Sequence, residues 1–136
     1  MSIAGSLDTN ILARLIVQDD EAQANLAAKL LEGHARRSEA LWIPISVVLE
    51  LEWVLRSRYK FNKVEVIQTF SGLLATIELV FESEGALEQA LASYEDGGAD
   101  FGEYLHLALA QYGQALPFWT FDTKASKTVG AKLLKL

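Results

Sequence analysis

The sequence contains no cysteine and only two prolines among its 136 residues. Without cysteine the chain can form no disulfide, no thiol nucleophile and no cysteine-bound zinc site, and this composition fits a reducing cytoplasm. The apolar stretches are short and interrupted by charge, far below the ~20 residues that a membrane-spanning helix needs. Residues 1–5 contain neither a basic region nor an apolar run, so no secretory signal is expected. We therefore expect a cytoplasmic protein that does not enter a membrane.

Basic residues are absent from a long stretch of the chain. Between Val64 and Thr123 there is no Lys or Arg, while ten Asp or Glu occur there. The net charge of −6 argues against a protein that binds nucleic acid by bulk electrostatics. The basic residues gather in two short runs, which are either solvated helix ends or places that hold a polyanion. The runs consist of Arg56, Arg58, Lys60 and Lys63, and of Lys124, Lys127, Lys132 and Lys135.

Hydrophobic residues make up 51% of the chain, enough for the core of a single domain over residues 1–136. Short apolar strands alternate with helical patterns, which predicts an α/β fold. We expect a central, mostly parallel sheet of about four to five short strands, flanked by helices. The expected strands end near residues 7, 43, 80 and 121, and the expected helices cover about 9–16, 20–33, 46–58, 63–75, 83–94 and 100–112.

The helical spacing also predicts which side chains lie in the core. Leu26, Leu30 and Leu31 form the apolar stripe of the second expected helix. Ser46 is predicted to cap the third helix, and Tyr112 is predicted to be buried at the end of the last one.

Five acidic residues occupy positions that this fold would bring to one edge of the sheet. Asp8 and Asp122 follow apolar strands, and Glu50, Asp100 and Glu103 lie in the first turns of helices. In parallel sheets the ligand crevice lies outside the carboxyl ends of the strands, where the following helices begin. The sequence therefore predicts one acidic site. Each residue alone could instead be a turn, a cap or a partner of the helix dipole.

Glu50 is the hardest of the five to explain structurally. It is flanked by Leu49 and Leu51 in a helix that is apolar on most sides. A buried, unpaired carboxylate is costly, and a bound cation is the simplest way to keep several such groups ionised. Glu52 points about 200° away from Glu50 around the helix and is predicted to be solvated.

Oxygen ligands suit Mg²⁺ or Mn²⁺ rather than zinc, because the chain has no cysteine and no histidine cluster. His34 and His106 stand alone in the sequence, although His106 follows Glu103 by about one helical turn. A carboxylate-held divalent metal serves phosphoryl chemistry, since it activates water and stabilises charge on the leaving oxygen.

Four blocks of the sequence, in this order, resemble the PIN-domain ribonucleases and, within them, the VapC-like toxins of bacterial toxin–antitoxin pairs. The blocks are residues 7–12 (LDTNIL), 45–55 (ISVVLELEWVL), 98–105 (GADFGEYL) and 120–122 (TFD). The resemblance places the family's first acid on Asp8, its Glu on Glu50 and its last acid on Asp122. The family usually has Asp where this chain has Glu103, and Asp100, one turn earlier, shares or assumes that role.

The resemblance also implies an activity and partners. It implies an endoribonuclease that uses Mg²⁺ or Mn²⁺, with metal held by Asp8, Glu50, Asp122 and Asp100 or Glu103. Positions that support such a site fall on Asn10, Ser46 and Thr120. A small antitoxin protein and a second copy of the chain are the implied partners. Arg56, Arg58, Lys60 and Lys124 are the candidate contacts to RNA or a partner.

Two alternatives stay open at this stage. Glu103 and the negative net charge favour a catalytically impaired PIN-like module that binds RNA or a partner protein. A phosphotransfer domain with a nucleophilic Asp fits less well, because Asp8 lacks a second Asp two residues on and Lys124 is poorly placed beside Asp122.

Overall fold

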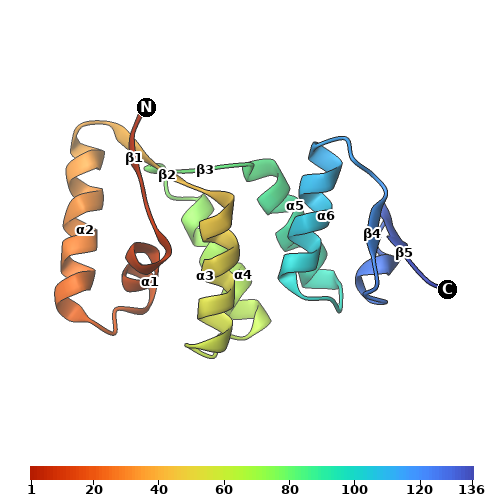
Figure 1. The fold of residues 1–136 in the computed structure, drawn as a ribbon. Coiled ribbons are helices and arrows are strands. Elements are labelled where there is room, and N and C mark those ends of the chain that lie inside the picture. Colours follow the sequence, from red (N-terminus) through yellow and green to blue (C-terminus); the bar gives the residue numbers. More distant parts are fainter. The chain divides into compact units, whose positions relative to one another are not determined.

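The computed structural model covers residues 1–136 and divides into two compact units, Met1–Glu82 and Ser83–Leu136 (Figure 1). The first unit contains β1 (Ser2–Ser6), α1 (Thr9–Val17), α2 (Glu21–Arg36), β2 (Glu39–Ile43), α3 (Ile45–Ser57), α4 (Lys63–Leu74) and β3 (Leu79–Phe81). The second contains α5 (Glu84–Asp96), α6 (Phe101–Tyr112), β4 (Phe118–Thr120), the 3-10 turn η1 (Ala125–Lys127) and β5 (Ala131–Leu133).

The predicted α/β class with parallel strands is confirmed. β1, β2 and β3 form one parallel sheet in that order, with Ser6 opposite Trp42 and Ile43 opposite Phe81. β4 and β5 pair in parallel as a separate two-stranded sheet in the second unit. The sequence did not indicate β5, because a three-residue strand near the end of the chain has no periodicity to detect.

The sheet of the first unit is held by apolar side chains from the neighbouring helices. α1 packs against α2 and α3, and α2 packs against β2. Five fully buried residues form much of this core, namely Leu12, Ile43, Val48, Leu51 and Leu55. Residues 2–6 of β1 lie at the edge of the sheet and are exposed, whereas Leu7, directly after the strand, is buried. One buried residue, Leu7, therefore stands between the exposed strand and Asp8.

Three details of the expected packing are wrong. Leu26 and Leu30 are 69% and 41% exposed, because α2 buries its alanines Ala24 and Ala27 instead. Tyr112 is 61% exposed at the end of α6. The third helix begins one residue before the predicted cap, so Pro44 is the N-cap and Ser46 lies in the first turn.

The other helix starts agree closely with the sequence. Asp20 caps α2 by accepting a hydrogen bond from the Gln23 amide at 3.1 Å. Asn62 and Glu65 form a reciprocal capping box at the start of α4, which accounts for its sharp beginning after the loop. None of the six helices has the length and apolar character needed to cross a bilayer.

Candidate functional site

Asp8 is placed by the end of the first strand and the start of the first helix. The amide of Leu7 still donates to the carbonyl of Trp42 at 3.0 Å, so the pairing of β1 with β2 continues up to Asp8. Asp8 is the N-cap of α1, and its Oδ1 accepts a hydrogen bond from the Ile11 amide at 3.1 Å. The side chain is exposed, and its second oxygen is free to bind a ligand. The capping hydrogen bond thus fixes one oxygen of the Asp8 carboxylate and leaves the other oxygen for a ligand.

Glu50 is joined to the same region through Thr9. The Thr9 hydroxyl donates to Oε1 of Glu50, so the first residue of α1 holds a carboxylate of α3. Thr9 is 5% exposed, and it directly follows Asp8. Sequence reasoning passed over Thr9. The only signal was its place in the Asp-Thr-Asn block, between the predicted ligand Asp8 and the predicted supporting residue Asn10.

The exposures predicted for the two glutamates of α3 are reversed. Glu50 is exposed, whereas Glu52 is 2% exposed and pairs with Arg56 at 2.8 Å. The buried face of α3 runs through Val48, Leu51, Glu52 and Leu55, so a rotation of the helix relative to the expected face explains both errors. Glu50 therefore does not need a cation to offset burial, and its link to the start of α1 is the hydrogen bond from Thr9.

Asn10 and Ser46, the predicted supporting residues of this unit, both lie near these acids in the chain. Ser46 is exposed and precedes Glu50 by four residues, so the two share one face of α3. Asn10 lines a groove of about 550 Å³ together with Asp8, Ile11, Leu26 and Leu30. The groove places an apolar wall, formed by the exposed leucines of α2, next to the carboxylate of Asp8.

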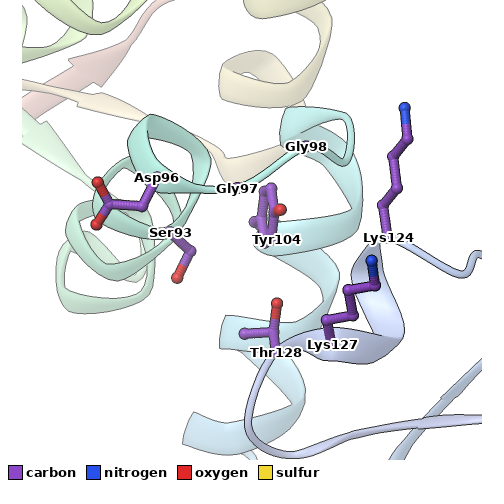
Figure 2. Close-up of a pocket in the computed structure, with 8 residues that line it drawn as sticks. All are labelled: Ser93, Asp96, Gly97, Gly98, Tyr104, Lys124, Lys127 and Thr128. Atoms are coloured by element: carbon purple, nitrogen blue, oxygen red, sulfur yellow. The ribbon is translucent and has the colours of Figure 1, made fainter.

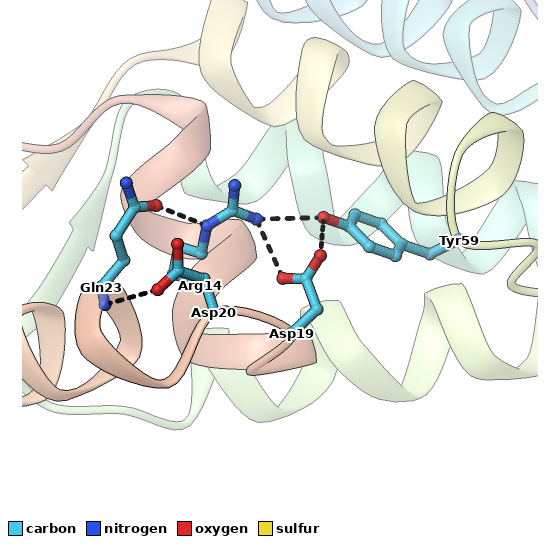
Figure 3. Close-up of polar contacts among 5 residues, drawn as sticks. All are labelled: Arg14, Asp19, Asp20, Gln23 and Tyr59. Atoms are coloured by element: carbon cyan, nitrogen blue, oxygen red, sulfur yellow. Dashed lines mark hydrogen bonds and ion pairs between the residues drawn. The ribbon is translucent and has the colours of Figure 1, made fainter.

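A polar network holds the far end of α1 and borders the same groove (Figure 3). Arg14 donates to Asp19 at 2.9 Å, to Gln23 at 2.6 Å and to the Tyr59 hydroxyl at 3.1 Å. Tyr59 in turn donates to Asp19 at 3.0 Å. The Tyr59 hydrogen bond and the charge of Asp19 raise the pKa of Arg14, although desolvation opposes them. The network ties α1 to α2 and to the segment after α3.

In the second unit Asp122 is held by the loop that follows β4. Its Oδ1 accepts from the Ala125 amide at 2.8 Å, and its own amide donates to the Thr120 hydroxyl at 2.9 Å. The carboxylate is half-buried. Thr120 was predicted to support the site, and it does shape the loop that carries Asp122.

Asp100 shares a cavity with Asp122. The two residues line a hollow of about 380 Å³, together with Phe121 and Lys124. Asp100 occupies the N-cap position of α6, but its side chain makes no capping hydrogen bond and is exposed. Glu103 lies half-buried in the first turn, and its amide donates to the Asp100 carbonyl at 3.1 Å. His106, one turn further, is exposed and its ring lies 6.3 Å from that of Phe118.

The basic residues divide into two groups by their contacts. Arg56 pairs with Glu52, Arg58 lies 5.7 Å from the Tyr59 ring, and Lys60 donates to the Ser57 carbonyl at 2.7 Å. These local contacts fit the solvated end of a helix. Lys124 is exposed and lines the cavity of Asp100 and Asp122. A role for any of the four in RNA binding stays a prediction.

The oxygens of these acids suit a hard divalent cation. Asp8 and Glu50 lie in the first unit, and Asp100, Glu103 and Asp122 lie in the second. Asp8, Asp122 and Glu50 each use one carboxylate oxygen in a hydrogen bond and keep the other. Neither unit by itself assembles three acidic or histidine side chains into a group that could hold a metal ion. Such donors match Mg²⁺ or Mn²⁺ chemically.

Acidic residues follow parallel strands in both units, Asp8 shortly after β1 and Asp122 shortly after β4. The family model of the PIN domain matches residues 6–131 of this sequence, which spans both units. The chain belongs to the PIN domain family. PIN domains are generally nucleases that use divalent metals, so the chain has a nuclease fold. A comparison with curated proteins found no match. One domain over residues 1–136 stays a prediction.

Proposed function

We propose that this protein is a Mg²⁺- or Mn²⁺-dependent endoribonuclease. The observation that carries the proposal is the match to the PIN domain over residues 6–131. In addition, the proposed acidic residues follow strands or lie in the first turns of helices. Asp8 and Glu50 act with Asp122 and with Asp100 or Glu103.

Each residue has a defined part in this proposal. The carboxylates hold the cation, which when bound activates water and offsets the charge that develops on the phosphate. Thr9 orients Glu50 by donating to Oε1, and Thr120 orients Asp122 through its backbone amide. The exposed position of Asp8 gives RNA direct access to the site. Removing a hydrogen bond that orients a metal ligand typically costs about 10- to 100-fold in metal affinity or activity.

The test is RNA cleavage with Mn²⁺ by the parent and by Asp8→Asn. Asp20→Asn is a matched control, because Asp8 and Asp20 are both N-caps that accept a hydrogen bond at 3.1 Å. Asparagine caps helices about as well as aspartate, so both variants are expected to fold. We expect Asp8→Asn to lose cleavage and Asp20→Asn to keep it. Equal activity in the two variants would remove Asp8 from the mechanism.

We further propose that the ribonuclease is the toxin of a toxin–antitoxin pair and acts as a homodimer. The four blocks that resemble VapC-like toxins support this assignment. Leu26 and Leu30, exposed beside Asp8 in the groove of the first unit, provide an apolar surface of the kind that a small antitoxin would cover. Growth arrest on expression of the parent, but not of Asp8→Asn, is the expected result. Unimpaired growth with active enzyme present would contradict the toxin role.

A catalytically impaired module is the second candidate, and Glu103 is the observation that favours it. The longer side chain stands where the family usually has Asp, and it is half-buried on α6. In that case the parent would bind RNA without cleaving it in Mn²⁺. Glu103→Asp would then restore cleavage, whereas in an active enzyme the same change has a small effect.

A further inference from the structure

A second cavity in the unit Ser83–Leu136 has no part in the carboxylate site. It measures about 610 Å³ and lies between the end of α5, the start of α6 and η1 (Figure 2). Lys124 and Lys127 line it, together with the hydroxyl groups of Ser93, Tyr104 and Thr128. The wall is therefore rich in groups that donate hydrogen bonds.

The two lysines supply the charge of this cavity. Both are exposed, and they flank the same short turn (Figure 2). Asp96 also lines the cavity, but Figure 2 shows its carboxylate pointing away from the lysines. The second unit has only two other basic residues, Lys132 and Lys135. Two of the four basic residues of this unit therefore line this cavity.

A buried hydroxyl lies at the same cavity. Tyr104 is 3% exposed, and its oxygen accepts a hydrogen bond from the Ala99 amide at 3.1 Å. Its own proton stays available to donate. The chain can approach Tyr104 this closely only at a glycine, because a Cβ at Gly97 would lie 1.8 Å from the hydroxyl oxygen. Ser93 and Thr128 add two further hydroxyl-bearing side chains to the lining.

The cavity adjoins the hollow that contains Asp100 and Asp122. Gly98 and Lys124 line both, so Lys124 stands between the two. A ligand with successive negative groups that binds at the acids through a cation therefore has its next negative group near Lys124. A nucleic-acid strand is such a ligand, because it carries one phosphate per nucleotide.

We propose that this cavity binds a backbone phosphate of the RNA, next to the phosphate that is cleaved. The inference rests on the proposed function and names the part of the substrate that the second cavity holds. The Lys127 ammonium and the hydroxyl groups at the cavity match the several acceptor oxygens of a phosphate, and Lys124, whose exposed ammonium extends away from these hydroxyls in Figure 2, adds positive charge at the rim. Lysine binds phosphate as a point charge. The negative net charge of the chain makes such a local site necessary, since bulk attraction for RNA is absent.

The experiment measures RNA binding without cleavage. A fluorescein-labelled single-stranded oligouridylate is titrated in EDTA at several salt concentrations with the parent and with Lys124→Gln/Lys127→Gln. Lys132→Gln/Lys135→Gln is the matched control, because it removes the same charge from the same unit outside the cavity. We expect the first variant to bind about tenfold more weakly, with a salt slope lower by about 0.7, as the loss of one phosphate contact to a single strand predicts.

A second measurement locates the site. The amide resonances are recorded during a titration with inorganic phosphate. The resonances of Gly97, Gly98 and Thr128 are expected to shift in the parent but not in Lys124→Gln/Lys127→Gln. Equal loss of RNA affinity in the two lysine variants, or no shift of these amides, would overturn the phosphate cavity.

Both measurements are independent of nuclease activity. Lysine-dependent binding without cleavage in Mn²⁺ would support the phosphate site and contradict the proposed enzyme. Mn²⁺-dependent cleavage with unchanged oligouridylate binding in Lys124→Gln/Lys127→Gln would support the enzyme and contradict the phosphate site.

Discussion

The Thr9 hydroxyl donates a hydrogen bond to Oε1 of Glu50, across 41 positions of sequence. Thr9 follows Asp8 directly at the start of α1. Two adjacent residues therefore provide the Asp8 carboxylate and orient the Glu50 carboxylate. The bond fixes one oxygen of Glu50 and leaves the other for a ligand. This arrangement explains why a hydroxyl residue stands beside Asp8 in a position that is otherwise buried.

Thr9→Val is expected to weaken Mn²⁺ binding by about 10- to 100-fold, because residues that orient metal ligands contribute on that scale. The substitution keeps the branched shape and removes only the hydroxyl. Calorimetric titration with Mn²⁺ measures the change. Thr69→Val is the control, since the Thr69 hydroxyl donates only to the carbonyl of Glu65 in its own helix. Parent-like Mn²⁺ affinity in Thr9→Val would show that Glu50 needs no such support.

The choice between Asp100 and Glu103 can be made with two matched variants. Asp100 lines the same hollow as Asp122, and its carboxylate makes no capping hydrogen bond to α6. Asp100→Asn is therefore expected to weaken Mn²⁺ binding. Glu103→Gln is measured beside it, and each amide keeps the size of the acid it replaces. An outcome in which only Glu103→Gln lowers the affinity would exclude Asp100 as a ligand.

Arg56 is expected to contribute to stability rather than to RNA binding. It pairs with Glu52, which is 2% exposed, so Arg56→Gln leaves a buried carboxylate without this partner. We expect a loss of about 1–3 kcal/mol in the free energy of unfolding, measured with urea.

Arg36→Gln is the control for that measurement. Arg36 and Glu32 form an ion pair of the same spacing at 3.9 Å, but both side chains are exposed. Such surface pairs contribute about 0–1 kcal/mol. If Arg56→Gln and Arg36→Gln lower the free energy of unfolding by the same amount, the burial of Glu52 does not make its ion pair more stabilising.

Because of Glu39, the stability of the first unit is expected to depend on pH in the acid range. Hydrogen bonds from Arg37 at 2.8 Å and from His34 at 2.9 Å lower the pKa of Glu39. A carboxylate whose folded pKa is lowered stabilises the fold above its unfolded pKa, and this contribution disappears as the pH falls through the folded value.

The parent is therefore expected to be more stable than Glu39→Gln near neutral pH, and the difference is expected to shrink below about pH 4. Urea unfolding at a series of pH values measures it. Glu88→Gln, which removes an exposed carboxylate without an ion pair, is the control. A difference between the parent and Glu39→Gln that stays constant down to acid pH would contradict the proposed linkage.

The helices were predictable from the sequence because their caps are local. Asp20, Asn62 and the Gly97-Gly98 break lie within three residues of the ends they define, and all three ends were predicted. The strand that ends before Asp8 was also predicted, since an apolar residue directly precedes the acid.

The exposure of individual side chains was less predictable, and α3 shows why. This helix is apolar on most sides, so its sequence does not indicate which face turns to the core. Glu52 can be buried only because Arg56, one turn later, pairs with it. The contact between Thr9 and Glu50 joins residues that are distant in sequence, and the sequence contains no local signal for it.

The most direct test of the proposed enzyme asks whether Asp8 and Asp122 act together in catalysis. Asp8→Asn, Asp122→Asn and the double variant are compared with the parent in single-turnover cleavage of RNA with Mn²⁺. Residues that act as a unit in catalysis are strongly non-additive. We predict that either single variant loses about 1000-fold or more in rate and that the double variant loses no more. Single losses that multiply in the double variant, or cleavage that survives both changes, would contradict the account.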